Sequence, residues 1–184
     1  TLLPGRRILQ ECLPERFAAL RGAGIGSVAQ LLKALSTPQK IAALEKTTGL
    51  TEEYLTILRR EAGSLEQKPT PLADFPGTDG ALISAMAERG IRSSKDYFER
   101  VYGTDAELDA LCDLARVNGV GAVAARAFYE AGYRSASDVA GADAAKMLSQ
   151  ISAVNAQKQY YRAKLAVKDM QFCIDFACLL MRYS

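Results

Sequence analysis

One short pattern occurs three times in the sequence, and it restricts the possible folds more than any other feature. Glycine, isoleucine or tyrosine, any residue, and then serine follow one another from Gly24, Gly90 and Gly132. A large apolar residue stands four positions before each glycine, which is the spacing of one helix face. A glycine at this place is typical of a helix end, where a left-handed backbone conformation stops the helix. The pattern therefore predicts three helices with defined C-termini.

The serine of each repeat is expected to begin the next helix. A glutamine or aspartate follows each serine by three residues, in the pairs Ser27 with Gln30, Ser93 with Asp96 and Ser135 with Asp138. Such a pair satisfies free amides of the first helical turn in a capping box. Thr37 before Pro38 predicts a further helix start, and so does Thr104 three residues before Glu107.

We expect an all-α protein, because the alternating β-branched runs that are typical of strands do not occur. The spacing of stop and start signals predicts about ten short helices. The stretch EQKPTPLADFPG, residues 66–77, is rich in proline and is the best candidate for a linker. It predicts two domains, residues 1–67 and residues 70–184.

The C-terminal stretch is expected to form one long helix from Asn155 to Tyr183 that is apolar on several faces. We favour a helix buried between the two halves of the chain over an exposed interaction surface. On such a helix Lys158 and Arg162 share one face, whereas Lys164 and Lys168 share another. These basic residues therefore do not form a continuous stripe for phosphate binding.

Composition excludes several classes of active site. The chain of 184 residues has no histidine, so imidazole cannot serve as a base or a metal ligand. Its four cysteines lack the spacing of a zinc site or a disulfide framework, and we expect buried, reduced thiols. We therefore expect neither a metal nor a cofactor.

Targeting signals are also missing from the sequence. No apolar run reaches membrane-spanning length, and the N-terminal residues lack the apolar core of a signal peptide. We expect a cytoplasmic protein with no membrane contact. A removed N-terminal leader stays an alternative, because the chain does not begin with methionine.

A pair of glycines interrupts the helical pattern near residue 120. Gly119 and Gly121 flank Val120, and Ala125 follows in the pattern G-x-G-x-x-x-A. Glycine is unfavourable inside a helix, so the pair indicates a tight hairpin between two helices.

This pattern resembles the helix-hairpin-helix motif. The resemblance implies that the glycines turn the chain, that Val120 packs between the helices, and that backbone amides point outward toward a phosphate oxygen. Positive charge could come from two neighbouring arginines. The candidate nucleic-acid-binding residues are Arg116, Gly119, Val120, Gly121, Ala122 and Arg126.

The other hairpins of this kind have lost these features. FPGTDGAL keeps Gly77 but has Asp79 where a phosphate would bind, and TTGLTEEYL places Glu52 and Glu53 there. QECLPERF keeps neither glycine. A carboxylate at this place repels an anion, so we interpret these three hairpins as structural.

Across nearly the whole chain, the sequence resembles an uncharacterised bacterial family of tandem, degenerate helix-hairpin-helix units, domain-of-unknown-function family 4332. The resemblance depends on GIGSVAQLLKALSTPQKIAALEKTTGLTEEYLTILRR, on LARVNGVGAVAARAFYEAGYRSASDVAGAD and on the last helix with Asp169 and IDFACLL. It implies an all-α fold of tandem helix-hairpin-helix (SAM-like) repeats with a long C-terminal helix, and no particular reaction.

Three classes of function follow from these observations. The first is a non-catalytic module that binds the backbone of DNA or RNA without sequence preference, although the formal charge of +2 is small for this role. The second is a protein interaction scaffold or a module that forms homo-oligomers. The alternative to the first is that the glycines only allow two helices to pack closely, and the alternative to the second is the buried C-terminal helix described above.

An enzyme is the third class and the least supported. The aspartate that follows the hairpin, Asp138, is better placed to cap a helix than to act in catalysis. Tyr160 and Tyr161 could stack on bases, but tyrosines on a helix more often belong to the core or its rim. We expect no catalytic activity.

Overall fold

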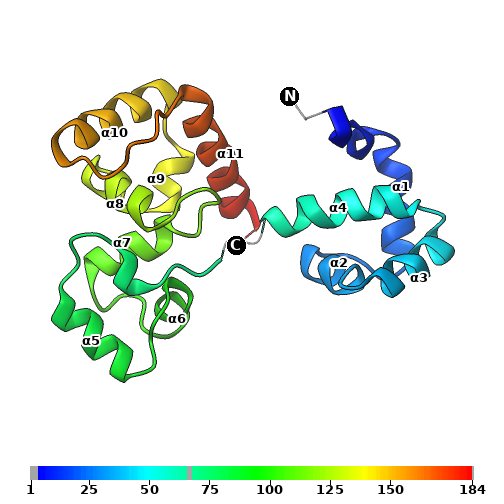
Figure 1. Ribbon diagram of the computed structural model, residues 1–184, viewed down its shortest axis with the longest axis horizontal. Coiled ribbons are helices and arrows are strands. Elements are labelled where there is room, and N and C mark those ends of the chain that lie inside the picture. Colours follow the sequence, from blue (N-terminus) through cyan, green and yellow to red (C-terminus); the bar gives the residue numbers. More distant parts are fainter. Residues whose placement is uncertain (1–3, 66–67, 184) are drawn as a thin grey trace. The chain divides into compact units, whose positions relative to one another are not determined.

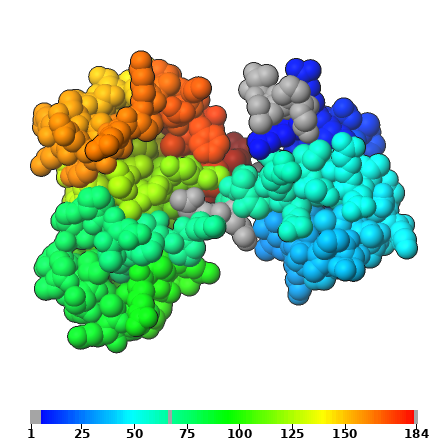
Figure 2. Space-filling model, in the orientation of Figure 1, coloured from blue at the N-terminus to red at the C-terminus, as the bar shows by residue number. Residues whose placement is uncertain are grey.

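The computed structural model describes residues 4–65 and 68–183, which contain eleven α-helices and two 3-10 helices (Figure 1). Within these residues, β-type pairing is limited to one isolated bridge between Pro71 and Ser93. The all-α prediction is therefore confirmed. The chain divides into two compact units, Thr1–Glu66 and Gln67–Ser184, which Figure 2 colours from blue to cyan and from green to red.

Unit 1 is built around its longest helix. Its elements are η1 (Pro4–Gln10), α1 (Leu13–Gly22), α2 (Val28–Ala34), α3 (Pro38–Thr48) and α4 (Glu52–Leu65). Helix α4 contacts η1, α2 and α3, because its apolar face is directed to the centre of the unit. The buried core consists of Leu20, Leu31, Leu35, Ile41, Leu50, Tyr54, Leu55 and Ala62.

Unit 2 contains the larger core and all six candidate residues. Its elements are η2 (Leu72–Asp74), α5 (Gly80–Glu88), α6 (Ser94–Arg100), α7 (Ala106–Leu114), α8 (Ala122–Glu130), α9 (Ala136–Ala140), α10 (Ala144–Lys158) and α11 (Val167–Tyr183). Helix α7 contacts α6 and α8, and α10 contacts α8 and α11. The short helix α9 packs on α11, as the grouping of these helices in Figure 1 also shows.

The three repeats adopt one geometry. Gly24, Gly90 and Gly132 all have a positive φ, of 80°, 74° and 103°. The residue after each glycine donates its amide to the large apolar residue five positions earlier, in the pairs Ile25 to Leu20, Ile91 to Met86 and Tyr133 to Phe128, each at 3.0 Å. This bond defines a Schellman motif, so the predicted helix ends are confirmed.

The three serines are N-caps, as predicted. Each hydroxyl accepts the amide three residues ahead, at the starts of α2, α6 and α9. Only Asp96 also accepts the amide of its own serine, whereas the side chains of Gln30 and Asp138 accept the amides of Gly26 and Arg134, one residue earlier. Among the three repeats, the full capping box is therefore present in the second, at Ser93 and Asp96.

The predicted cap at Thr37 is confirmed, but the one at Thr104 is wrong. Thr37 accepts the amide of Lys40 at the start of α3. Helix α7 instead begins after Asp105, whose carboxylate accepts the amides of Glu107 and Leu108. The hydroxyl of Thr104 lies 3.3 Å from the buried hydroxyl of Tyr97, and a carboxylate is the stronger acceptor for a helix start.

The stretch expected to be a linker is only partly one. The boundary between the units falls between residues 66 and 67, but from Thr70 onward the chain belongs to unit 2. Thr70 exchanges hydrogen bonds with Ser94, and Leu72 and Phe75 are buried in the core. The prolines exclude a long helix here without preventing the chain from packing.

The single C-terminal helix predicted from Asn155 is wrong, because α10 ends at Lys158 and α11 begins at Val167. Gln159 has a left-handed backbone conformation, with φ 53°. The Asn155 side chain then binds both backbone groups of Tyr161, accepting its N–H and donating to its C=O at 3.0 Å each. This side chain replaces the helical hydrogen bonds, and residues 159–166 form a connector between the two helices.

The cysteine expectation holds for two of the four residues. Cys112 and Cys173 are buried, and burial raises the pKa of their thiols to about 12 and about 11. Both are therefore protonated at neutral pH. Cys12 and Cys178 are free thiols too, but they are exposed.

Replacing a helix-ending glycine is expected to destabilise unit 2 through its backbone alone. A Cβ at Gly132 would meet nothing within 4 Å, so the cost of Gly132→Ala arises from φ and should be about 1 to 2 kcal/mol. Gly80→Ala is the control, because its Cβ also has free space and its φ is not positive. Urea unfolding followed by circular dichroism measures both. An equal loss of stability in the two variants would contradict the prediction.

Candidate binding site at the start of helix α8

The hairpin between α7 and α8 places its three central residues differently. Gly119 has φ 88°, and a Cβ there would lie 3.4 Å from Cε1 of Phe172, so glycine is required for both conformation and space. Val120 is fully buried, as expected for a side chain between two helices. Its amide donates to the carbonyl of Val117 at 3.0 Å, so this amide is already engaged within the hairpin.

Helix α8 begins without a side-chain cap. Helices α5, α6, α7, α9 and α10 each start with a serine or aspartate whose side chain accepts a first-turn amide, but α8 has Gly121 there. First-turn amides have no intrahelical acceptor. In the described part of the chain, no other acceptor is found for the amides of Ala122, Val123 and Ala124. These three donors are available to a ligand.

The glycine at position 121 is not required by the fold. Its backbone has φ −84° and ψ −176°, which any residue adopts. A Cβ at Gly121 would meet nothing within 4 Å. A serine or aspartate would therefore fit and would cap α8, as it does in the neighbouring helices. Packing therefore does not require the absence of a capping side chain at position 121.

Arg116 is held by internal contacts. Its guanidinium donates to Oδ1 of Asp113 at 2.7 Å and lies 4.4 Å from the centre of the Phe98 ring. The other oxygen of Asp113 accepts the amide of Ala136 at the start of α9, at 2.8 Å. Arg116 thus belongs to a junction of α6, α7 and α9.

Arg126 is buried and does not face solvent. Its side chain is 5% exposed, and its guanidinium donates to Glu107 at 2.6 Å. The guanidinium also packs on Gly77, where a Cβ would lie 3.8 Å from Cζ, and its Nε has no partner among the described residues. Of the two positive charges that we expected beside the hairpin amides, that of Arg126 is therefore buried, and that of Arg116, whose side chain is 28% exposed, is paired with Asp113.

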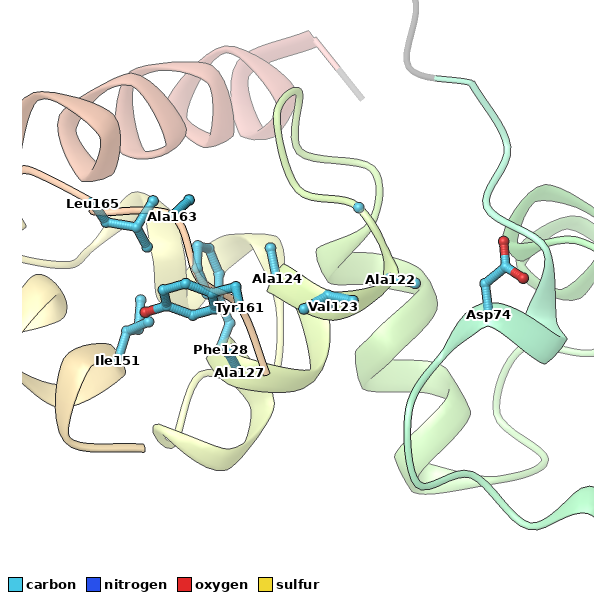
Figure 3. A pocket seen from close by; sticks show the side chains of 11 residues that line it. Asp74, Ala122, Val123, Ala124, Ala127, Phe128, Ile151, Tyr161, Ala163 and Leu165 are labelled. Atoms are coloured by element: carbon cyan, nitrogen blue, oxygen red, sulfur yellow. The ribbon is translucent and has the colours of Figure 1, made fainter. Parts of the chain in front are cut away.

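A largely apolar cavity of about 600 Å³ opens beside the start of α8. We call it the α8 hollow, and its lining residues are Asp74, Gly121, Ala122, Val123, Ala124, Ala127, Phe128, Ile151, Tyr161, Ala163 and Leu165. Figure 3 shows Tyr161 and Ile151 on one side of the first residues of α8 and Asp74 on the other. Its volume lies within the range of sites for small ligands and short peptide segments.

The connector borders the α8 hollow with alternating side chains. Tyr161, Ala163 and Leu165 line the hollow, whereas Arg162 and Lys164 between them are exposed. Neither basic residue forms an ion pair within the described ranges 4–65 and 68–183. The helical arrangement that we predicted separated these two residues onto different faces, but the connector is not helical, and the two residues flank a bend at Ala163.

A second, smaller cavity of about 280 Å³ also adjoins this turn, with Gly119 in its lining. It shares Ala124, Phe128 and Leu165 with the α8 hollow and also includes Phe172 of α11. The ring of Phe172 is 52% exposed, which is unusual for a large aromatic side chain. Apolar surface therefore continues from the α8 hollow past Gly119 to α11.

The hairpin was predictable from the sequence, but most of the hollow was not. Gly121 and Ala122 line it, as two of the six candidate residues. Asp74, Ile151 and Tyr161 were not expected there, because they come from three segments that only the fold brings together. The alternation of apolar and basic residues from Tyr161 to Leu165 was the one signal in the sequence that could have indicated a bordering strand-like segment.

Comparison with known proteins gives a partial match. A family model described as a domain of unknown function (DUF7898) matches residues 109–173, which include the hairpin, α8, α9, α10 and the connector. The match fits an uncharacterised family, as the sequence indicated, but this family is not family 4332. No curated protein matches the chain, and no solved structure matches it.

The described residues contain neither a membrane-spanning helix nor a cluster of metal ligands. None of their helices has the length and apolar character needed to cross a bilayer. In the same ranges, no group of three or more acidic or cysteine side chains is arranged to hold a metal ion.

We expect the ion pair between Arg126 and Glu107 to be structural. We also expect that loss of Glu107, the less buried partner, lowers stability more than loss of Arg126. Glu107→Ala leaves a buried guanidinium without its counter-charge and should cost about 3 kcal/mol of unfolding free energy. Arg126→Met removes the buried charge and retains apolar volume, so it should cost less, although Arg126 is the more buried partner. Urea denaturation of both variants and of the double variant measures this order. A larger loss in Arg126→Met would show that the guanidinium contributes mainly through its other contacts.

Proposed function

We propose that this protein is a non-catalytic binding module that receives an apolar segment of a partner protein in the α8 hollow. The observation that favours this function is the combination of an open, apolar cavity with a helix start that lacks a cap. Exposed apolar surface of this kind is typical of interaction sites. The pairing of the nearby arginines supports it further, because Arg126 is buried against Glu107 and Arg116 is bound to Asp113, so neither is an unpaired cation beside the hairpin.

We also infer that α7, the hairpin and α8 form a helix-hairpin-helix unit. The positive φ of Gly119, the buried Val120 and the helix start at Gly121 support this inference. The three Schellman motifs favour degenerate repeats of the same unit along the chain. We propose in addition that the chain is related to family 4332 and that the protein is cytoplasmic.

The absence of catalysis is part of the proposal as well. Cys112 and Cys173 keep their protons at neutral pH because burial raises the pKa of both thiols. Asp138 accepts the amide of Arg134 at 2.7 Å and lies at the start of α9, so its carboxylate has a structural task. These residues support a binding module better than an enzyme.

Binding of a DNA or RNA backbone is the second candidate function. It is favoured by the three free amides at the start of α8, which suit a phosphate oxygen, and by a glycine that the fold itself does not require. Arg162 and Lys164 would supply the positive charge in place of Arg116 and Arg126. Asp74 in the lining of the same hollow opposes it, because its carboxylate repels phosphate.

Photo-cross-linking in cell extract tests the first candidate. A photoreactive phenylalanine analogue at Val123, which is 38% exposed and lines the α8 hollow, should give discrete adducts that protease removes. The same analogue at Ala156, an exposed residue of α10 outside the hollow, should give none of these adducts. Adducts that only nuclease removes would favour the second candidate, and identical adducts at both positions would contradict a site in the hollow.

A salt series with duplex DNA tests the second candidate. If amides and basic side chains bind phosphate, affinity should fall steeply with salt, and Gly121→Asp should abolish binding because its carboxylate occupies the anion position. Gly80→Asp is the matched control, since it adds the same charge to the first turn of α5. We expect from the charge arrangement that both variants behave like the original protein and bind duplex DNA only weakly. A selective loss in Gly121→Asp would reverse the order of the two candidates.

A further inference from the structure

We propose that the α8 hollow selects a partner segment with opposite charges at its two ends, a basic residue that meets Asp74 and an acidic residue that meets Arg162 and Lys164, with apolar side chains between them. This inference rests on the proposed function, because it specifies the chemistry of the segment that the hollow receives. It follows from how charge is distributed around the hollow.

The centre of the hollow sets the apolar part of the segment. Apart from Asp74, the lining consists of Gly121, alanines, Val123, Phe128, Ile151 and Leu165, with the ring of Tyr161. These side chains offer no charged group to a ligand. A segment gains free energy there by removing aliphatic or aromatic side chains from water.

One end of the hollow is acidic. Asp74 lies at the end of η2, and Figure 3 shows it on the side of Ala122 that is opposite to Tyr161. Its side chain has no hydrogen bond or ion pair within the described residues, in contrast to Asp79, Asp105 and Asp143, which cap helices. A lysine or arginine of the partner would provide its missing counter-charge.

The other end is basic and also offers a hydroxyl. Arg162 and Lys164 are exposed on the connector on either side of Ala163, next to the residues that line the hollow. Burial raises the pKa of Tyr161, so its hydroxyl keeps its proton at neutral pH and can donate to a carboxylate. Three donors of this kind favour an acidic residue of the partner at this end.

Backbone N–H groups at the start of α8 can donate hydrogen bonds to the partner segment between its two charged ends. The amides of Ala122, Val123 and Ala124 line the middle of the hollow without an acceptor in the described residues. A backbone carbonyl of an extended segment can accept from them and fix its register. A duplex nucleic acid has no cationic group that would form an ion pair with Asp74, and a fatty acid has only one charged end, so a peptide segment uses more of the observed features.

Synthetic peptides measure this selectivity on the full-length protein. The first probe has two aspartates, a central Leu-Phe-Ala-Leu-Leu sequence and two lysines, and a second probe has the same residues with the charged ends exchanged, so that either chain direction is sampled. Replacing the apolar centre by serines gives the reference peptide. By isothermal titration calorimetry, the better probe should bind at least about tenfold more tightly than its serine reference.

A charge exchange tests the acidic end. Asp74→Lys should weaken binding of the better probe by about twofold to fivefold, because an exposed ion pair becomes a repulsion, and replacing the probe's lysines with aspartates should restore it. Both effects should decrease at high salt. Ala163→Trp, which fills the hollow from the exposed connector, should abolish binding, whereas Ala156→Trp on the outside of α10 should not.

The outcomes separate this inference from the proposed function. If the apolar centre matters but the Asp74→Lys exchange has no effect, the charge selectivity is wrong and the proposed function stands. If neither probe binds better than its serine reference while Val123 still cross-links to protein in extract, this inference fails alone. If duplex DNA displaces the bound probe and Gly121→Asp prevents that displacement, the hollow is a nucleic-acid site and the inference is overturned.

Discussion

The buried guanidinium of Arg126 is the contact on which the arrangement of unit 2 depends. It joins α8 to Glu107 of α7 and packs on the backbone at Gly77, which precedes α5. A buried cation requires a counter-charge, so this one position fixes the distance between three segments that are far apart in the sequence. Because the guanidinium is buried, Arg126 adds no positive charge to the surface of the hollow, where the exposed basic residues nearby are Arg162 and Lys164 of the connector.

Local sequence signals determined the helix boundaries well. A glycine stop and a serine start act through atoms within about six residues of each other, so the three repeats could be predicted from the order of residues alone. The errors at Thr104 and Asn155 are of a different kind. In the first, a neighbouring aspartate competes for the same amides, and in the second, one asparagine side chain replaces several helical hydrogen bonds. Neither effect changes the capping-box spacing at Thr104 or the apolar pattern after Asn155 on which the two predictions relied.

The site could be predicted only in part, for a physical reason. Gly121 and Ala122 were found because the hairpin is a contiguous pattern, but the cavity beside them is made by side chains from η2, α8, α10 and the connector. The charge of Arg126 was misjudged for the same reason, because helix packing brings Glu107 of α7 to it. The partner of Arg116, Asp113, lies only three residues earlier in the sequence, so this local pair could have been predicted.

The uncovered start of α8 has an energetic meaning. Glycine in place of serine at a helix N-cap lowers stability by only a few tenths of a kcal/mol, while the same position could accept a side chain without any steric conflict. The absence of a side-chain cap at α8 therefore lowers the stability of the domain only slightly. The fold therefore tolerates this opening, and a one-residue change is enough to close it.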